Sequence, residues 1–327
     1  MSAKKRVLTF LVEKKGDYVS GGEMARALQV SRNSIWKAVK SLQEEGYAIR
    51  AVTNRGYCLE ENNVRISREE ILSYLHSRAF RLEVCESADS TNSLLKKRAQ
   101  AGEPEGLVLI AQEQTGGRGR NGRAFFSPKD SGIYMSILLR PSLEFSKAVY
   151  LTTCAAAAVA EVLDEFTEEE TRIKWVNDIF CRNRKAAGIL TEAAVDMEDG
   201  KLEYAVLGIG INVFPPAKGW PEDIRESAGA VLDTVDGAWG VRNRIIARIL
   251  ERFWAYYQEL PGTGYAESYR RKSMVLGKEI LVQKGKETYR GIAVGLDEEF
   301  HLEVEREDGN REFLSSGEVH ILGIDGT

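Results

Sequence analysis

The chain has 327 residues, of which 43% are hydrophobic and 29% charged, the composition of a soluble globular protein with two or three domains. No apolar run approaches the roughly 20 residues that span a membrane, no signal peptide is apparent, and four scattered cysteines predict neither a disulfide framework nor a tightly bound metal, so we expect a cytoplasmic protein without membrane contact. The net charge of −4 is uneven, since residues 1–62 carry 11 Lys and Arg against 7 Asp and Glu, and this basic head predicts contact with a polyanion.

The basic head has the pattern of a winged helix-turn-helix. Ser20 and Glu23 form a capping box at the start of one helix, and Ser31 is a good N-cap for a second. That second helix has an apolar stripe made of Ile35, Trp36, Val39 and Leu42. An earlier helix over 6–16 and a hairpin over 47–59 complete the expected fold.

The second helix and the wing are the expected DNA-binding elements, because they carry cations and polar groups on the face opposite the stripe. The candidate DNA-binding residues are Ser31, Arg32, Asn33, Lys37, Lys40 and Arg55. A winged helix that contacts only other proteins remains the alternative.

The centre of the chain mixes strands with helices in an α+β pattern. Strands are predicted over 106–114, 132–140, 172–181, 185–195 and 204–214, and short connections require several of them to pair antiparallel. Core helices are predicted over 147–166 and 242–260, and a shorter helix is capped by Ser67. From about residue 274, short strands separated by turns predict a small SH3-like barrel.

Four segments follow from this reading. They are a winged helix-turn-helix over 1–62, a linker and helix over 63–79, a catalytic α+β domain with a mixed or antiparallel sheet over 80–270, and the SH3-like domain over 271–327.

The stretch GGRGRNGR at 116–123 contains the G-x-G-x-x-G spacing of a dinucleotide-binding turn. Such a turn must open a helix, whereas the residues that follow, RAFFSPKDSG, contain paired aromatics and a proline. The three arginines favour a loop that neutralises phosphate and closes over its ligand. A basic surface loop without a ligand is the alternative.

Two other sequence features support a ligand-binding site that includes this loop. Ser90, Thr91 and Asn92 are small polar groups suited to a compact polar ring, although such a run also caps helices. The segments KWVND at 174–178 and RKAAGILTE at 184–192 read as one hairpin, on which a lysine beside Gly188 suits a carboxylate or phosphate.

These motifs, with GIGIN at 208–212, occur in the order found in bifunctional biotin protein ligases that are also biotin operon repressors, and the chain resembles that family over essentially its whole length. Two positions depart from the family pattern. Val176 replaces a usual proline, which is expected to relax a turn, and Phe125 replaces a frequent tryptophan while keeping an aromatic platform.

The resemblance implies synthesis of biotinyl-5'-adenylate from biotin and ATP, with Mg²⁺, and transfer of biotin to a lysine of the carrier protein of acetyl-CoA carboxylase. The implied catalytic residues are Lys185, Arg118, Arg120 and Asp178. The implied biotin-binding residues are Ser90, Thr91, Asn92, Gln114, Arg118, Gly119, Arg120, Lys185 and Gly188. The implied adenylate-binding residues are Arg118, Arg120, Arg123, Phe125, Asn177, Lys185 and Asn212.

Some points stay open from sequence. Asp178 is a candidate base for the transfer step, or it orients an arginine of the loop. The resemblance also implies a homodimer that binds the operator of biotin genes when it holds the adenylate. A sensor that binds biotin without transferring it, and a ligase for lipoate, are the competing interpretations.

Overall fold

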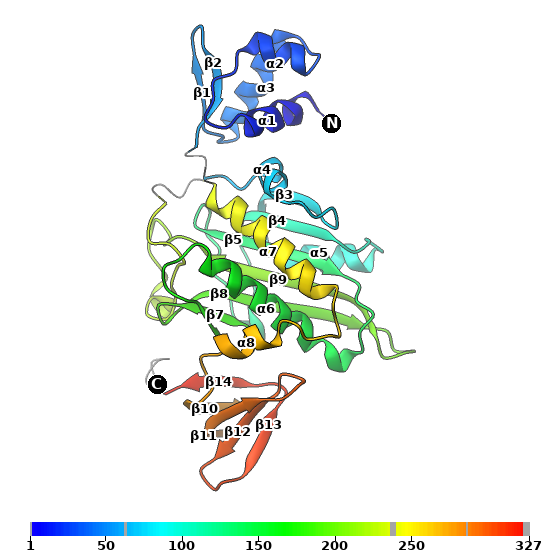
Figure 1. Ribbon diagram of the computed structural model, residues 1–327, viewed down its shortest axis with the longest axis vertical. Coiled ribbons are helices and arrows are strands. Elements are labelled where there is room, and N and C mark those ends of the chain that lie inside the picture. Colours follow the sequence, from blue (N-terminus) through cyan, green and yellow to red (C-terminus); the bar gives the residue numbers. More distant parts are fainter. Residues whose placement is uncertain (1, 62–63, 236–239, 286, 323–327) are drawn as a thin grey trace. The chain divides into compact units, whose positions relative to one another are not determined.

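The computed structural model describes residues 2–61, 64–235, 240–285 and 287–322 (Figure 1). Its contacts divide the chain into two units, one made of Met1–Arg78 with Thr234–Arg248 and the other of Ala79–Asp233 with Ile249–Thr327. The four domain limits expected from sequence divide the chain differently and stay a prediction. Each unit is described by itself below.

The first unit contains the expected winged helix-turn-helix. Its helices are α1 (Ala3–Glu13), α2 (Gly21–Ala27) and α3 (Arg32–Glu44), and its strands are β1 (Ile49–Val52) and β2 (Gly56–Leu59). The hydroxyls of Ser20 and Ser31 accept the backbone N–H of Glu23 and Ser34, which confirms both predicted caps. The strands pair antiparallel around a turn in which Asn54 and Gly56 have positive φ. The predicted wing is therefore present.

The predicted apolar stripe of α3 is wrong at one position. Ile35, Ala38, Val39 and Leu42 are buried, whereas Trp36 is 51% exposed. Successive side chains of an α-helix are rotated by about 100° about the helix axis, so the residue next to a buried one can point away from the core. Trp36 therefore lies at the surface of the unit.

A fourth helix completes this unit. The helix α4 (Arg68–Tyr74) is capped by Ser67 as predicted. The Asn243 side chain, at the start of α7 (Val241–Tyr257), accepts from the Ser67 backbone N–H and donates to the Arg65 carbonyl. Lys15 and the buried Glu70 form an ion pair with a 2.6 Å separation, which ties the end of α1 to α4.

The second unit is built on a seven-stranded mixed sheet with the order β3-β4-β5-β9-β8-β7-β6. Its strands are β3 (Arg81–Ala88), β4 (Leu107–Gln114), β5 (Gly132–Leu139), β6 (Arg172–Lys174), β7 (Asp178–Cys181), β8 (Arg184–Val195) and β9 (Leu202–Asn212). The strands β3 and β4 are parallel and are joined through α5 (Thr91–Gln100), while every other pair is antiparallel.

Two features of this sheet differ from the sequence prediction. The strand β3 was not predicted, because its half-exposed residues RLEVCESA lack a strong apolar signal. The single strand predicted over 172–181 is a hairpin, in which β6 and β7 flank a turn over 175–177. The peptide bond between Trp175 and Val176 in that turn is cis. The predicted pairing of the next segment is confirmed, since β7 pairs antiparallel with β8.

Helices cover both faces of the sheet. Thr191 of β8 bonds Thr152 of α6 (Val149–Asp164), while the next residue, Glu192, bonds Asn92 of α5. Because successive strand residues point to opposite faces, α5 and α6 lie on opposite sides of the sheet. The part of α7 that belongs to this unit, from Ile249 on, lies on the same side of the sheet as α6 (Figure 1), and Tyr256 of α7 donates to the Glu161 carboxylate of α6.

The helical segment Phe145–Asp164 corrects the expectation that no segment approaches membrane-spanning length. It is long and apolar enough to cross a membrane by composition, but 67% of its most apolar window is buried within the fold. Its alanines and leucines are buried against the sheet, and this burial explains why the segment is so rich in apolar residues.

A five-stranded antiparallel sheet follows the short helix α8 (Ala266–Lys272). Its strands are β10 (Glu279–Lys284), β11 (Glu287–Leu296), β12 (Leu302–Arg306), β13 (Arg311–Leu314) and β14 (Glu318–Ile321). The order β13-β12-β11-β10-β14 places the last strand against β10. The short strands predicted from about residue 274 are confirmed.

Candidate functional site

A cavity of about 740 Å³ opens on the second unit. Its lining comes from the start of α5, the loop after β4, the β6–β7 turn, the first half of β8, the end of β9, a segment around Trp220, and the residues around Glu318. Every candidate biotin or adenylate residue lines this cavity. The sequence motifs, separated by up to about 120 positions, are therefore brought to one place.

One end of the cavity is a compact polar pocket. Thr91 donates its backbone N–H and its hydroxyl to Gln114 Oε1 at 2.9 and 3.0 Å. The Ser136 hydroxyl lies 2.7 Å from Thr91 Oγ1 and 2.6 Å from Asn92 Oδ1. Ser90 accepts the Ser93 N–H, so it is the N-cap of α5 as well as a lining residue. Ser90, Thr91, Asn92 and Ser136 are buried and Gln114 is half-buried, and their mutual hydrogen bonds hold these groups in fixed positions.

Two glycines of the GIGIN strand make room for this lining. A Cβ at position 208 would lie 2.2 Å from Asn92 Oδ1, and a Cβ at position 210 would lie 2.6 Å from the ring of Phe125. Neither separation is possible for a real side chain, so glycine at both positions lets these groups approach the sheet.

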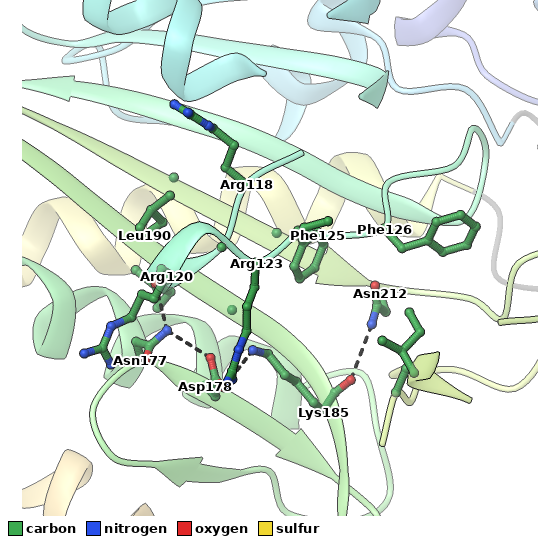
Figure 2. Close-up of a pocket in the computed structure, with 18 of the residues that line it drawn as sticks. Arg118, Arg120, Arg123, Phe125, Phe126, Asn177, Asp178, Lys185, Leu190 and Asn212 are labelled. Carbon is green, nitrogen blue, oxygen red and sulfur yellow. Dashed lines mark hydrogen bonds and ion pairs between the residues drawn. The ribbon is translucent and has the colours of Figure 1, made fainter. Parts of the chain in front are cut away.

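The other end of the cavity is cationic. Lys185 Nζ lies 2.7 Å from Asp178 Oδ2, and Asn177 Nδ2 donates to Asp178 Oδ1 at 2.9 Å. Arg120 Nη1 donates to Asn177 Oδ1 at 2.9 Å. Figure 2 shows Arg120 and Arg123 pointing from the loop toward this network, whereas Arg118 points away from it. Of the two arginines predicted to be catalytic, Arg120 is therefore bonded to this network through Asn177, and Arg118 is not part of it.

The glycine-arginine loop folds back on itself. The Gly119 N–H donates to the Arg123 carbonyl, and the Phe125 N–H donates to the Gly117 carbonyl. A single 3-10 turn over Arg120–Gly122 forms the tip, and extended backbone follows it. The expectation that no dinucleotide-type helix follows the loop is confirmed.

The tip of the loop contacts a residue that the sequence did not indicate. Glu318 of β14 accepts from Asn121 Nδ2 and pairs with Arg123 Nη2 at 2.6 Å. Burial would raise the pKa of the Glu318 carboxyl, but the Asn121 amide and the Arg123 guanidinium outweigh burial and hold that pKa below its usual value. No local motif marks this carboxylate, because 195 residues separate it from Arg123.

The two asparagines among the predicted adenylate-binding residues, Asn177 and Asn212, have different hydrogen-bond partners. Asn177 is buried, and its amide is occupied by Arg120, Asp178 and the Ile189 carbonyl, so it organises the network. Asn212 donates to the Gly229 carbonyl at 3.0 Å and to the Lys185 carbonyl at 3.4 Å. The Phe126 and Trp220 rings, which sequence reasoning missed, lie 6.4 Å apart at the cavity lining.

The DNA-binding candidates lie on the surface of the first unit. Ser31, Arg32, Asn33, Lys37, Lys40 and Arg55 are all exposed. The Arg55 guanidinium lies 4.1 Å from the centre of the Tyr18 ring. Within the described chain, no group of three or more His, Cys, Asp or Glu side chains is arranged to hold a metal ion.

Comparison with known proteins agrees with this arrangement. Residues 84–212 match the Biotin/lipoate A/B protein ligase family, residues 4–58 an HTH domain, and residues 275–322 the biotin protein ligase C terminal domain. The chain is 30% identical to the bifunctional ligase/repressor BirA of Bacillus subtilis over 321 residues, which is 96% of this chain and 97% of that protein. The chain belongs to the biotin protein ligase family. Its first unit carries the HTH domain of the bifunctional members.

Other members support the same grouping. The Escherichia coli bifunctional ligase/repressor BirA is 28% identical over 317 residues, covering 94% of each chain. The biotin protein ligase of Aquifex aeolicus, solved in complex with biotin and ATP, has a TM-score of 0.60 and 28% identity over 73% of this chain and 97% of that one. The similarity to these relatives supports the three parts seen in this chain, which are a helix-turn-helix, a ligase fold with a mixed sheet and a C-terminal antiparallel sheet.

Proposed function

We propose that this protein is a biotin protein ligase that forms biotinyl-5'-adenylate and passes biotin to a lysine of the biotin carboxyl carrier protein of acetyl-CoA carboxylase. One observation carries the proposal. The polar pocket at Ser90–Asn92 and the cationic network around Lys185 line one cavity. A ligand with a small polar ring at one end and a carboxylate at the other fits this polarity.

The first step joins two anions. A biotin carboxylate oxygen attacks the α-phosphorus of ATP, the bond to the bridging oxygen breaks, and pyrophosphate leaves with its electron pair. Lys185 and the loop cations Arg120 and Arg123 offset the charge repulsion and stabilise the charge of the transition state. Gln114, Gly119 and Gly188 would complete the biotin contacts, and Arg118 would join once the loop closes.

The second step needs a neutral amine. The acceptor lysine attacks the carboxyl carbon of the adenylate, AMP leaves, and the amine loses a proton. The ordinary pKa of lysine is about 10.4, so a nearby base assists. Asp178 is the carboxylate beside Lys185, and we assign it the positioning of that lysine and, through it, of the adenylate. The folded loop would keep water from the mixed anhydride.

Magnesium is expected to enter with ATP as part of the substrate, since phosphate oxygens are its preferred ligands. Three carboxylates line the cavity, those of Asp178, Glu226 and Glu318. Each would shield part of the charge that the metal brings. The lining contains oxygen donors and no thiols, and this suits magnesium.

The same chain is proposed to repress biotin genes, with the adenylate as corepressor. The exposed cations of α3 and the wing support binding to operator DNA. A homodimer formed with the adenylate would place two helix-turn-helix units on two half-sites. We also propose a cytoplasmic location and an SH3-like closure of the β10–β14 sheet.

The test of the enzymatic proposal is ATP–pyrophosphate exchange. Exchange is expected only when biotin is present, because the carboxylate is the attacking group. Exchange that is independent of biotin, or no exchange at all, would exclude the proposal. The repressor proposal has its own test, in which biotin with ATP should tighten binding to DNA from upstream of its own biotin genes.

A further inference from the structure

The exposed tryptophan of α3 has no structural explanation in its own unit. Trp36 is 51% exposed, although the other apolar residues of that helix, Ile35, Val39 and Leu42, are buried. Leaving half of the largest apolar side chain in water forfeits stabilisation that burial would supply. A residue of this kind on an element expected to bind a partner is typical of an interface.

The exposed neighbours of Trp36 are polar or positively charged. On a helix, the adjacent side chains are three and four positions away, which here are the exposed Arg32, Asn33 and Lys40 and the buried Val39. Lys40 Nζ lies 5.4 Å from the centre of the Trp36 ring, so the lysine stands over the aromatic face. In the described part of the chain, Arg32, Lys37 and Lys40 form no ion pair. This helix face therefore offers unneutralised cations around one aromatic ring.

A polyanion is complementary to such a face, and duplex DNA offers a partner both for the cations and for the aromatic ring. Cations bind phosphates, which fix position but carry no sequence information. The major groove presents one apolar group, the 5-methyl of thymine, and apolar side chains read it. We propose that Trp36 contacts a thymine methyl in the operator and gives α3 part of its sequence selectivity. The inference rests on the proposed repressor function.

The experiment uses the full chain with biotin and ATP. A duplex is first selected from a randomised DNA pool by binding to the wild-type protein, and a scrambled duplex of the same length serves for comparison. The Trp36→Ala variant is expected to lose roughly tenfold in affinity for the selected duplex. Its affinity for the scrambled duplex and the slope of log K against log salt should be unchanged, because no phosphate contact is lost.

Lys37→Ala is the matched control, since Lys37 is the next exposed residue of the same helix. It should weaken binding to both duplexes and reduce the salt slope by about one. Biotin transfer to a carrier domain should be normal in both variants, because the cavity lies in the second unit. Circular dichroism and thermal unfolding that match the wild type show that the first unit of each variant folds.

Replacing thymines of the selected duplex by deoxyuracil, one at a time, removes single methyl groups. At one position the wild type should lose about as much affinity as Trp36→Ala does, and the variant should lose nothing further there. If Trp36→Ala binds like the wild type, or if no uracil replacement weakens the wild type, the inference is wrong. A wild type that prefers no duplex overturns the repressor function and this inference together.

Discussion

Lys185 Nζ and Asp178 Oδ2 lie 2.7 Å apart on the paired strands β7 and β8, and Asn177 joins them to Arg120 of the loop. This chain of contacts links the glycine-arginine loop to the lysine expected to meet the biotin carboxylate. Sequence reasoning left Asp178 as a base or as a partner of a loop arginine. The structure pairs it with Lys185, and its only connection to a loop arginine among the described contacts runs through Asn177.

Replacing Lys185 by alanine should lower biotin-dependent ATP–pyrophosphate exchange by about a hundredfold or more, because a fixed cation at the developing charge is lost. Lys201→Ala is the control, as it removes a lysine that lies outside the cavity lining. Circular dichroism should be the same for both variants. Near-normal exchange in Lys185→Ala would remove this residue from the site.

Asp178→Asn separates the two roles of that carboxylate. If Asp178 positions Lys185, adenylate formation and transfer from preformed adenylate should both slow, since the lysine loses its partner in each step. Single-turnover assays of the two half-reactions provide the comparison. A variant slowed only in transfer, with its rate restored at high pH, would instead identify Asp178 as the base.

Glu318→Gln should loosen the loop, because the pair with Arg123 then loses its negative charge. Trypsin should cut after Arg118, Arg120 or Arg123 several times faster than in the wild type. The control is Glu303→Gln, which removes a carboxylate paired with Arg311 on the same sheet but outside the cavity lining. Equal cutting of the wild type and Glu318→Gln would show that this contact does not hold the loop.

The same contact has a predicted pH dependence. The pKa of Glu318 is lower in the folded protein than its ordinary value of 4.5. Its stabilisation is therefore fully present above the unfolded pKa and is lost as the pH falls through the folded pKa. The difference in hydrogen exchange of the loop between the wild type and Glu318→Gln should stay constant from about pH 7 to 5 and narrow only below about 4.5. A difference that fades above pH 5 would contradict this assignment.

Gly210→Ala should displace the Phe125 ring, because the new methyl would lie 2.6 Å from it. We expect ATP to bind about tenfold more weakly, as an aromatic platform for the adenine is lost. A double-mutant cycle tests this cause. In a Phe125→Ala background the glycine substitution should have little further effect, and additive losses would point to another cause.

Local signals were read correctly from the sequence. The caps at Ser20, Ser31 and Ser67 depend on one side chain and a backbone N–H three residues later, so the pattern is contained in four positions. The motif residues of the cavity were also found, although the family resemblance, rather than spacing, connected them.

Signals that depend on tertiary contact were missed. Trp36 reads as core because it adjoins Ile35, and only the packing of α3 shows which side of the helix faces the core. Glu318 has no motif, and its role depends on β14 pairing with β10. The strand β3 is weakly apolar and is specified largely by its parallel partner β4.

Mass spectrometry of a biotin carboxyl carrier domain incubated with this protein, ATP, and equal concentrations of biotin and lipoate tests the proposed ligase activity most directly. We expect one biotin on a single lysine and one AMP released for each biotin attached. Attachment of lipoate in place of biotin, or binding of biotin without any transfer, would contradict the proposal.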